Sequence, residues 1–230
     1  MIDRYEWAGG SEAMLRFGPQ DGPVVIAAPA LFEEANRTRA FLVRILRLLG
    51  VHGIAGALPD LPGQGESLLP THQATLAGWR DAFATAARHV SAVATVSIRG
   101  GALVDGPAPV SALWRLSPIT GAEQVKELWR IRQAAHDRPK LRYDPARFIA
   151  ELDVEVAGNR LAPGLLAAMN IAEPSSDAPV RTVRLDTNPR PADLKLPGRP
   201  LWRASEPDVD EPLAQALADD IAAWVHACVA

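Results

Sequence analysis

The sequence is poor in cysteine: Cys228 is the single one among 230 residues. This excludes an internal disulfide and a cysteine-based metal site. One unpaired cysteine fits a reducing compartment. The chain begins Met1-Ile2-Asp3-Arg4-Tyr5-Glu6, which lacks the apolar core of a signal peptide. We therefore expect a cytoplasmic protein.

Long apolar runs, basic stripes and metal-binding motifs are also missing. No apolar run approaches the roughly 20 residues of a membrane helix, so we expect no membrane span. The formal net charge of -3 lacks the basic excess of a nucleic-acid-binding domain. Neither an HxH nor an HExxH pattern occurs, and we expect no metal and no cofactor. A hydrophobic fraction of 48% is nevertheless ordinary for one globular core.

What the chain contains is an alternation of strand-like and helix-like segments. Apolar or alternating runs predict strands at 4–8, 12–17, 23–28, 53–58, 93–98, 110–114, 180–185 and 199–202. Amphipathic spacing predicts helices at 38–49, 75–90 and 213–229, with a loop at 29–37. The Gly9-Gly10 pair predicts that the first two strands form a hairpin. Such alternation favours an α/β fold, with a mostly parallel central sheet and helices on both faces.

The alternation stops between residues 120 and 179. This segment contains three predicted helices, at 121–135, 144–151 and 162–171, and no core strand. A structureless loop of that length would be improbable in a compact domain. We predict a single domain over residues 1–230, with a small helical cap inserted at 120–179.

The segment 93–104 is the most informative stretch. It predicts a buried strand that breaks at Gly100-Gly101 and continues into an apolar helix. Together with the turn Asp60-x-x-Gly63-x-Gly65-x-Ser67, it resembles the α/β-hydrolase superfamily, where this elbow carries the nucleophile as Gly-x-Ser-x-Gly. Here the frame reads Ser97-Ile98-Arg99-Gly100-Gly101. Arginine stays protonated and has no acceptor, so Arg99 cannot attack a carbonyl.

A narrower resemblance is carried by three further segments. They are similar to the exosortase-A-system-associated hydrolases at 29–37 with Glu33-Glu34 and Asn36-Arg37, at Leu113-Trp114 with Pro118 and Gly121, and at Glu155-Val156-Ala157-Gly158. The resemblance implies a link to bacterial exopolysaccharide and protein-sorting gene clusters. It also implies that an arginine at the elbow is not unique to this chain.

The other triad positions are incomplete as well. Asp186 follows the strand 180–185 and fits the acid, or it is a loop aspartate that accepts backbone hydrogen bonds. A histidine should lie within 202–210, and none occurs there. Ser97 is either a displaced nucleophile or a hydroxyl in the core. We expect surface positions for the histidines, of which His136, in the cap, could reach the site. The histidines are His52, His72, His89, His136 and His226.

Ligands of open α/β sheets bind beyond the carboxyl ends of the strands. In this chain those ends carry Glu33, Glu34, Asn36, Arg37, Arg99, Trp114, Asp186 and Glu206. Backbone N–H groups of Gly100 and of Ala30 or Leu31 would complete an anion-binding corner. The catalytic candidates are therefore Arg99, Asp186, Glu206 and Ser97.

Three hypotheses remain open at this stage. In the first, Arg99 bonds a carboxylate of Glu33, Glu34 or Glu206 and braces a degenerate site. In the second, Arg99 and the Gly100 N–H bind a small anionic or acyl ligand. In the third, Glu33 or Glu206 activates water for an ester or thioester hydrolase of non-classical mechanism. Whether the chain is an enzyme stays undecided, and a homodimer is one possible state.

Overall fold

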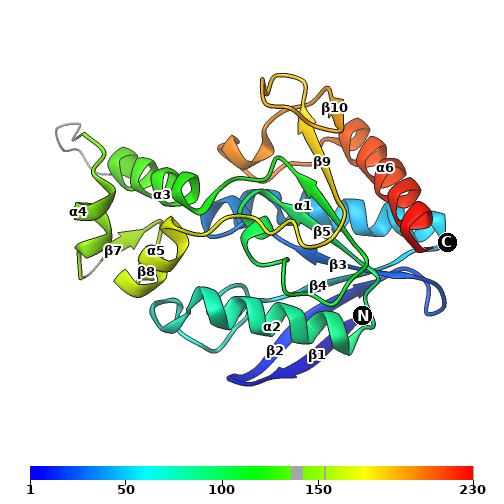
Figure 1. Cartoon of the computed structure of the whole chain (residues 1–230), viewed down its shortest axis with the longest axis horizontal. Helices are drawn as coiled ribbons and strands as arrows, with labels where there is room; N and C mark the ends of the chain where they lie inside the picture. Colours follow the sequence, from blue (N-terminus) through cyan, green and yellow to red (C-terminus); the bar gives the residue numbers. More distant parts are fainter. Residues whose placement is uncertain (136–141, 153, 230) are drawn as a thin grey trace.

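The computed structural model describes residues 1–135, 142–152 and 154–229, and its centre is one eight-stranded sheet (Figure 1). The strands are β1 (Ile2–Trp7), β2 (Gly10–Phe17), β3 (Val24–Ala28), β4 (Ala55–Pro59), β5 (Ala94–Ile98), β6 (Ala112–Leu116), β9 (Val180–Leu185) and β10 (Leu194–Leu196). Their order is β1-β2-β4-β3-β5-β6-β9-β10. β2 pairs antiparallel with β1 and β4, and all other pairs are parallel. The predicted mostly parallel sheet and the predicted hairpin are confirmed.

Helices cover both faces because the central strands are apolar on both. In β3, Val25 and Ala27 face one hydrophobic core, whereas Ile26 and Ala28 face the other. The first core is closed by α1 (Glu33–Leu49) and α6 (Glu211–Val229), which pack against each other. The second is closed by α2 (Leu76–His89). Short 3-10 turns occupy η1 (Gly50–His52), η2 (Thr71–Gln73) and η4 (Leu201–Arg203).

The segment between β6 and β9 lies beyond one end of the sheet in Figure 1. It consists of α3 (Gly121–Ala135), α4 (Pro145–Ala150), β7 (Val154–Val156), β8 (Asn159–Leu161) and α5 (Pro163–Asn170). Its three helices match the predicted ones, and α3 has the predicted bounds. The β7–β8 hairpin was not predicted, although Ala157 and Gly158 at φ of 49° and 79° make the two-residue turn that such a hairpin requires.

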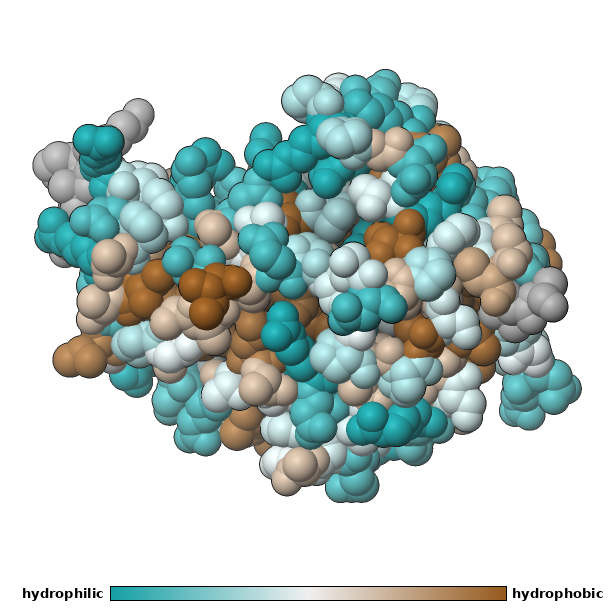
Figure 2. Space-filling model, in the orientation of Figure 1, coloured by the Kyte–Doolittle hydropathy of each residue, from teal (hydrophilic) through white to brown (hydrophobic). Residues whose placement is uncertain are grey.

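The apolar side of this segment packs against the α2 side of the molecule. Phe148, Leu166 and Met169 belong to the same core as Trp79 and Phe83 of α2. Apolar side chains also reach the surface where Figure 1 places α5 and β8 (Figure 2). None of the helices in the described ranges is long and apolar enough to cross a membrane.

Three boundary predictions were wrong. Residues 33–37 are not loop, because α1 begins at Glu33, where Phe32 turns the chain at φ 57° and two acidic residues favour the helix start. Beyond β5 the chain forms one 3-10 turn, η3 (Arg99–Leu103), instead of an α-helix. The final strand is β10 rather than 199–202, since Pro200 offers no N–H to a sheet.

Candidate functional site

The turn after β5 has the geometry of an elbow, with Arg99 at its tip. Arg99 adopts φ 54°, a left-handed conformation that is uncommon for a residue with a side chain. Gly101 packs so closely on the end of β3 that a Cβ there would lie 2.3 Å from the Ala28 carbonyl oxygen. A Cβ on Gly100 would lie 2.3 Å from Oε1 of Gln124. Backbone therefore excludes a side chain at Gly101, whatever residue occupies the tip, whereas the contact at Gly100 is with the end of the flexible Gln124 side chain.

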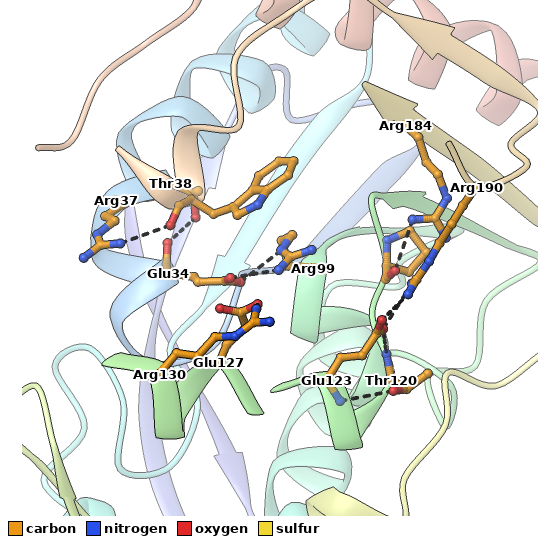
Figure 3. A network of polar contacts seen from close by, with 12 residues as sticks. Glu34, Arg37, Thr38, Arg99, Thr120, Glu123, Glu127, Arg130, Arg184 and Arg190 are labelled. Atoms are coloured by element: carbon orange, nitrogen blue, oxygen red, sulfur yellow. Dashed lines mark hydrogen bonds and ion pairs between the residues drawn. The ribbon is translucent and has the colours of Figure 1, made fainter. Parts of the chain in front are cut away.

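Arg99 is held by Glu34 from the first turn of α1. Its Nε and Nη2 donate to the two carboxylate oxygens over 3.2 and 3.0 Å, and its guanidinium lies 4.8 Å from the Trp202 ring (Figure 3). Arg99 is 7% exposed and Glu34 is 5% exposed. Burial raises the pKa of Glu34, and the Arg99 charge opposes that rise. Of the three carboxylates proposed for Arg99, the structure pairs it with Glu34.

Ser97 lies in the core, beneath the elbow. Its hydroxyl donates to Oδ2 of Asp105 over 2.6 Å, and its side chain is fully buried. Arg115 donates to both oxygens of the same carboxylate, over 2.9 and 2.6 Å. The hydroxyl is thus engaged in a buried ion-pair network and does not line the pocket described next.

A pocket of about 410 Å³ opens directly over Arg99. It lies between the carboxyl ends of β6 and β9, helix α3 and the 3-10 turn η4. Its charged lining consists of Arg99, Lys126, Arg130, Arg184, Arg190 and Arg203 against Glu123 and Glu127. The lining therefore carries a formal charge of +4 within a chain whose net charge is -3. Such a pocket attracts an anion.

Several of these cations already have acidic partners. Glu123 accepts from Arg190, with one of the two contacts at 3.1 Å, and this pairing lowers the pKa of Glu123. Glu127 pairs with Arg130 at 2.6 Å on the exposed side of α3. Arg184 instead donates to two backbone carbonyls, those of Pro191 and Pro118, over 3.2 and 3.4 Å.

The predicted anion-binding corner is partly filled. Oε1 of Gln124 and the Leu31 side chain occupy the space beside Gly100, the latter at 3.2 Å from a Cβ built there. Gln124 Oε1 is buried and has no hydrogen-bond partner among the residues that the structure describes. A side-chain oxygen next to the Gly100 backbone repels the oxyanion that such a corner would stabilise.

The other predicted site residues are not part of the pocket lining. Asp186 and Glu206 are exposed. Trp114 is fully buried in the core, where its indole N–H donates to Asp220 over 2.8 Å, because its side of β6 faces α6. Glu33 pairs with Arg37 at 3.3 Å on the outside of α1, and Asn36 bonds Glu33 over 3.4 Å. Arg37 also donates to the Trp202 carbonyl over 3.2 Å, which ties α1 to η4.

No histidine in the described part of the chain lines the pocket. His52 and His89 pair with surface acids, at 3.0 Å from Asp219 and 3.3 Å from Asp3. His72 and His226 are exposed, and His136 lies outside the described residues. Within the same residues no cluster of three or more metal-ligating side chains occurs.

Sequence reasoning missed Ser117, Glu123, Arg184 and Arg190, which line this pocket. The signal for Arg184 was present, because a charged residue in the apolar strand 180–185, two positions before Asp186, faces the same side as the strand end. Glu123 and Arg190 meet only through the tertiary fold, and no local pattern marks them.

The chain matches no protein-family model and no curated protein. Among solved structures it is similar to Est1E from Butyrivibrio proteoclasticus with ferulic acid bound, at TM-score 0.68 and 15% identity over 99% of each chain. An AqdC variant, described as ring-cleaving toward the Pseudomonas quinolone signal, gives TM-score 0.61 and 13% identity over 99% of this chain and 100% of that one. A thermophilic esterase from Thermogutta terrifontis gives a TM-score of 0.57 and 14% identity over 98% of this chain and 99% of that one. The chain therefore has the α/β-hydrolase fold, with an arginine at the elbow where that fold presents its nucleophile.

Proposed function

We propose that this chain binds a small anionic molecule in the pocket over Arg99 and does not hydrolyse it. The observation that carries the proposal is the surplus of positive charge in that pocket, +4 in the lining of a net acidic chain. A volume of about 410 Å³ is within the range of small-molecule sites. An anion with hydrogen-bond acceptors is the ligand that such a lining favours.

The same geometry argues against hydrolysis. The elbow presents a guanidinium, and that guanidinium is bonded to Glu34. Ser97 is bonded to Asp105 beneath the surface. Glu33 and Glu206, the candidates for activating water, do not line the pocket. The carboxylates that do line the pocket, Glu123 and Glu127, are paired with Arg190 and Arg130. The described lining therefore lacks the serine–histidine pair that supplies most of the rate in this fold.

In this proposal the segment 120–179 acts as a cap. Helix α3 supports that role because it contributes Glu123, Lys126, Glu127 and Arg130 to the pocket wall. The cap thus supplies half of the charged lining residues, and ligand selectivity should change when they are replaced.

The test combines activity and binding on the purified chain. We expect no mass adduct with a fluorophosphonate probe and no turnover of short-chain or long-chain nitrophenyl esters. Small organic anions should raise the melting temperature, as any ligand specific for the folded state does. Labelling and turnover that are both lost in Ser97→Ala would overturn the proposal and identify Ser97 as a displaced nucleophile.

The biological setting that we propose is exopolysaccharide production or export. Its support is the resemblance of segments 29–37, 113–121 and 155–158 to exosortase-associated hydrolases. Deleting the gene in its own host should reduce exopolysaccharide output, and re-expression should restore it. Unchanged output after deletion would contradict this setting without affecting the binding proposal.

A further inference from the structure

Ser117 and Arg184 form a buried corner at the floor of the pocket. The Ser117 N–H donates to the Val183 carbonyl over 2.8 Å, which places Ser117 beside Arg184 where β6 and β9 end. Ser117 is 1% exposed and Arg184 is 9% exposed, and both line the pocket. Two buried polar side chains therefore line the same pocket at the carboxyl edge of the sheet.

The Ser117 hydroxyl has no hydrogen-bond partner among the described residues, although it is buried. Its backbone is also held at φ 48°, in the left-handed region. A buried hydroxyl without a partner costs free energy. Buried polar atoms of this kind in a pocket indicate a ligand that supplies the missing bond.

Arg184 is oriented by two backbone carbonyls rather than by a carboxylate. Its Nε and Nη1 donate to the carbonyls of Pro191 and Pro118, whereas Nη2 has no partner within the described ranges. In the part of the chain that the structure describes, no carboxylate forms an ion pair with Arg184. Burial lowers the pKa of Arg184 and the nearby charge of Arg190 lowers it further, whereas Glu123 opposes this shift and Arg99 adds to it. A buried cation without a counterion is costly, and a bound anion would remove that cost.

The neighbouring arginines are less available for a ligand. Figure 3 shows Arg99 bonded to Glu34 on one side of the site and Arg190 bonded to Glu123 on the other. Arg184 lies beside Arg190 without such a carboxylate partner (Figure 3). Of the two buried arginines in the described lining, Arg99 and Arg184, it is the one without a carboxylate partner.

We propose that Arg184 and Ser117 bind the phosphoryl group of a small phosphomonoester, an inference that rests on the proposed function. Arg184 Nη2 and the Ser117 hydroxyl donate to its oxygens. When Glu34 is counted with the lining residues, a formal charge of +3 is left over, which suits a dianion better than a carboxylate. Thr187 and Asn188 in the remaining wall suit a hydroxylated body such as a sugar.

The experiment is titration calorimetry at constant ionic strength with three probes: inorganic phosphate, glucose 1-phosphate and gluconate. We expect glucose 1-phosphate to bind more tightly than gluconate, and phosphate to compete with it. Arg184→Gln should lower the affinity for glucose 1-phosphate about tenfold or more, because one charge-assisted contact is lost. Ser117→Ala should weaken it severalfold. Arg88→Gln removes the same charge from the exposed end of α2 and should leave the affinity unchanged.

The outcomes separate this inference from the proposed function. Binding of gluconate without binding of either phosphate would overturn the inference and leave the proposed function standing. No binding by any probe would overturn both. Unchanged affinity in a folded Arg184→Gln variant would overturn the assignment of Arg184. If that variant does not fold, Arg184→Lys keeps the charge without the planar fork, and its affinity for glucose 1-phosphate should still fall.

Discussion

Arg99 and Glu34 form a two-point ion pair that joins the tip of the elbow to the first turn of α1. The guanidinium is further covered by the Trp202 ring. This arrangement places a charge where the fold presents a nucleophile, and it supplies the partner that a buried charge needs. The pair therefore braces the elbow against the first turn of α1 at the carboxyl edge of the sheet.

Breaking that pair should be costly. Glu34→Gln leaves the Arg99 charge buried without a carboxylate, and we expect a loss of about 3–5 kcal/mol in unfolding free energy by urea titration. Glu33→Gln is the matched control, since the adjacent Glu33–Arg37 pair is partly exposed, and it should cost less than about 1 kcal/mol. Equal losses in the two variants would show that the pair does not brace the site.

Gly101 should tolerate no side chain. A Cβ there would lie 2.3 Å from the Ala28 carbonyl oxygen and 2.6 Å from that of Pro29, and backbone cannot give way as a flexible side chain can. We expect Gly101→Ala to cost about 3 kcal/mol in the same titration. Gly164→Ala, in α5 with open space around it, should be neutral or stabilise by about 0.5 kcal/mol. A neutral Gly101→Ala would refute the close packing of the elbow.

The core network under the elbow should depend on Asp105 far more than on Ser97. Asp105→Ala leaves Arg115, which is 3% exposed, without its carboxylate, so we expect a loss of about 3–5 kcal/mol. Ser97→Ala removes one hydrogen bond and should cost about 1 kcal/mol. Thermal unfolding followed by circular dichroism measures both. A larger loss for Ser97→Ala would contradict this ranking.

The Glu123–Arg190 pair predicts a pH dependence. Hydrogen bonds from Arg190 hold the pKa of Glu123 below its ordinary value. The stability from this pair is therefore present above the unfolded-state pKa of about 4.3 and is lost as the pH falls through the lower folded-state pKa. Arg190→Gln should flatten this part of the stability profile below about pH 4.5 while costing less than about 1 kcal/mol near neutrality. An unchanged acid limb would show that the pair does not stabilise the fold.

Much of the fold was predictable because its strands are short apolar runs between turn residues. The bounds of β9 and α3 agree with the predicted segments 180–185 and 121–135. The start of α1 was missed because the charged residues from Glu33 to Arg37 read as a loop, whereas in the fold Glu34 is buried against Arg99. The contact with Arg99, which is distant in sequence, explains why this charged segment forms the first turn of the helix.

The candidate site was predictable in part. The sequence identified Arg99 and offered Glu34 as one of its partners, because both follow core strands. It could not identify the pocket cations of α3 and the β9–β10 loop. Their proximity depends on how helix α3 lies against the carboxyl ends of β6 and β9, and residues 123 and 190 are far apart along the chain. Trp114 was misjudged for a related reason, since alternation along β6 does not reveal which face α6 covers.

The packing of the elbow glycines affects how hydrolases can be recognised from sequence patterns. In this chain Gly101 is needed to seat the elbow on the end of β3, independently of any reaction. A search that recognises hydrolases by such a glycine pattern will therefore also collect chains that lack the nucleophile at the elbow. The residue at the tip, together with what its side chain is bonded to, separates the two groups.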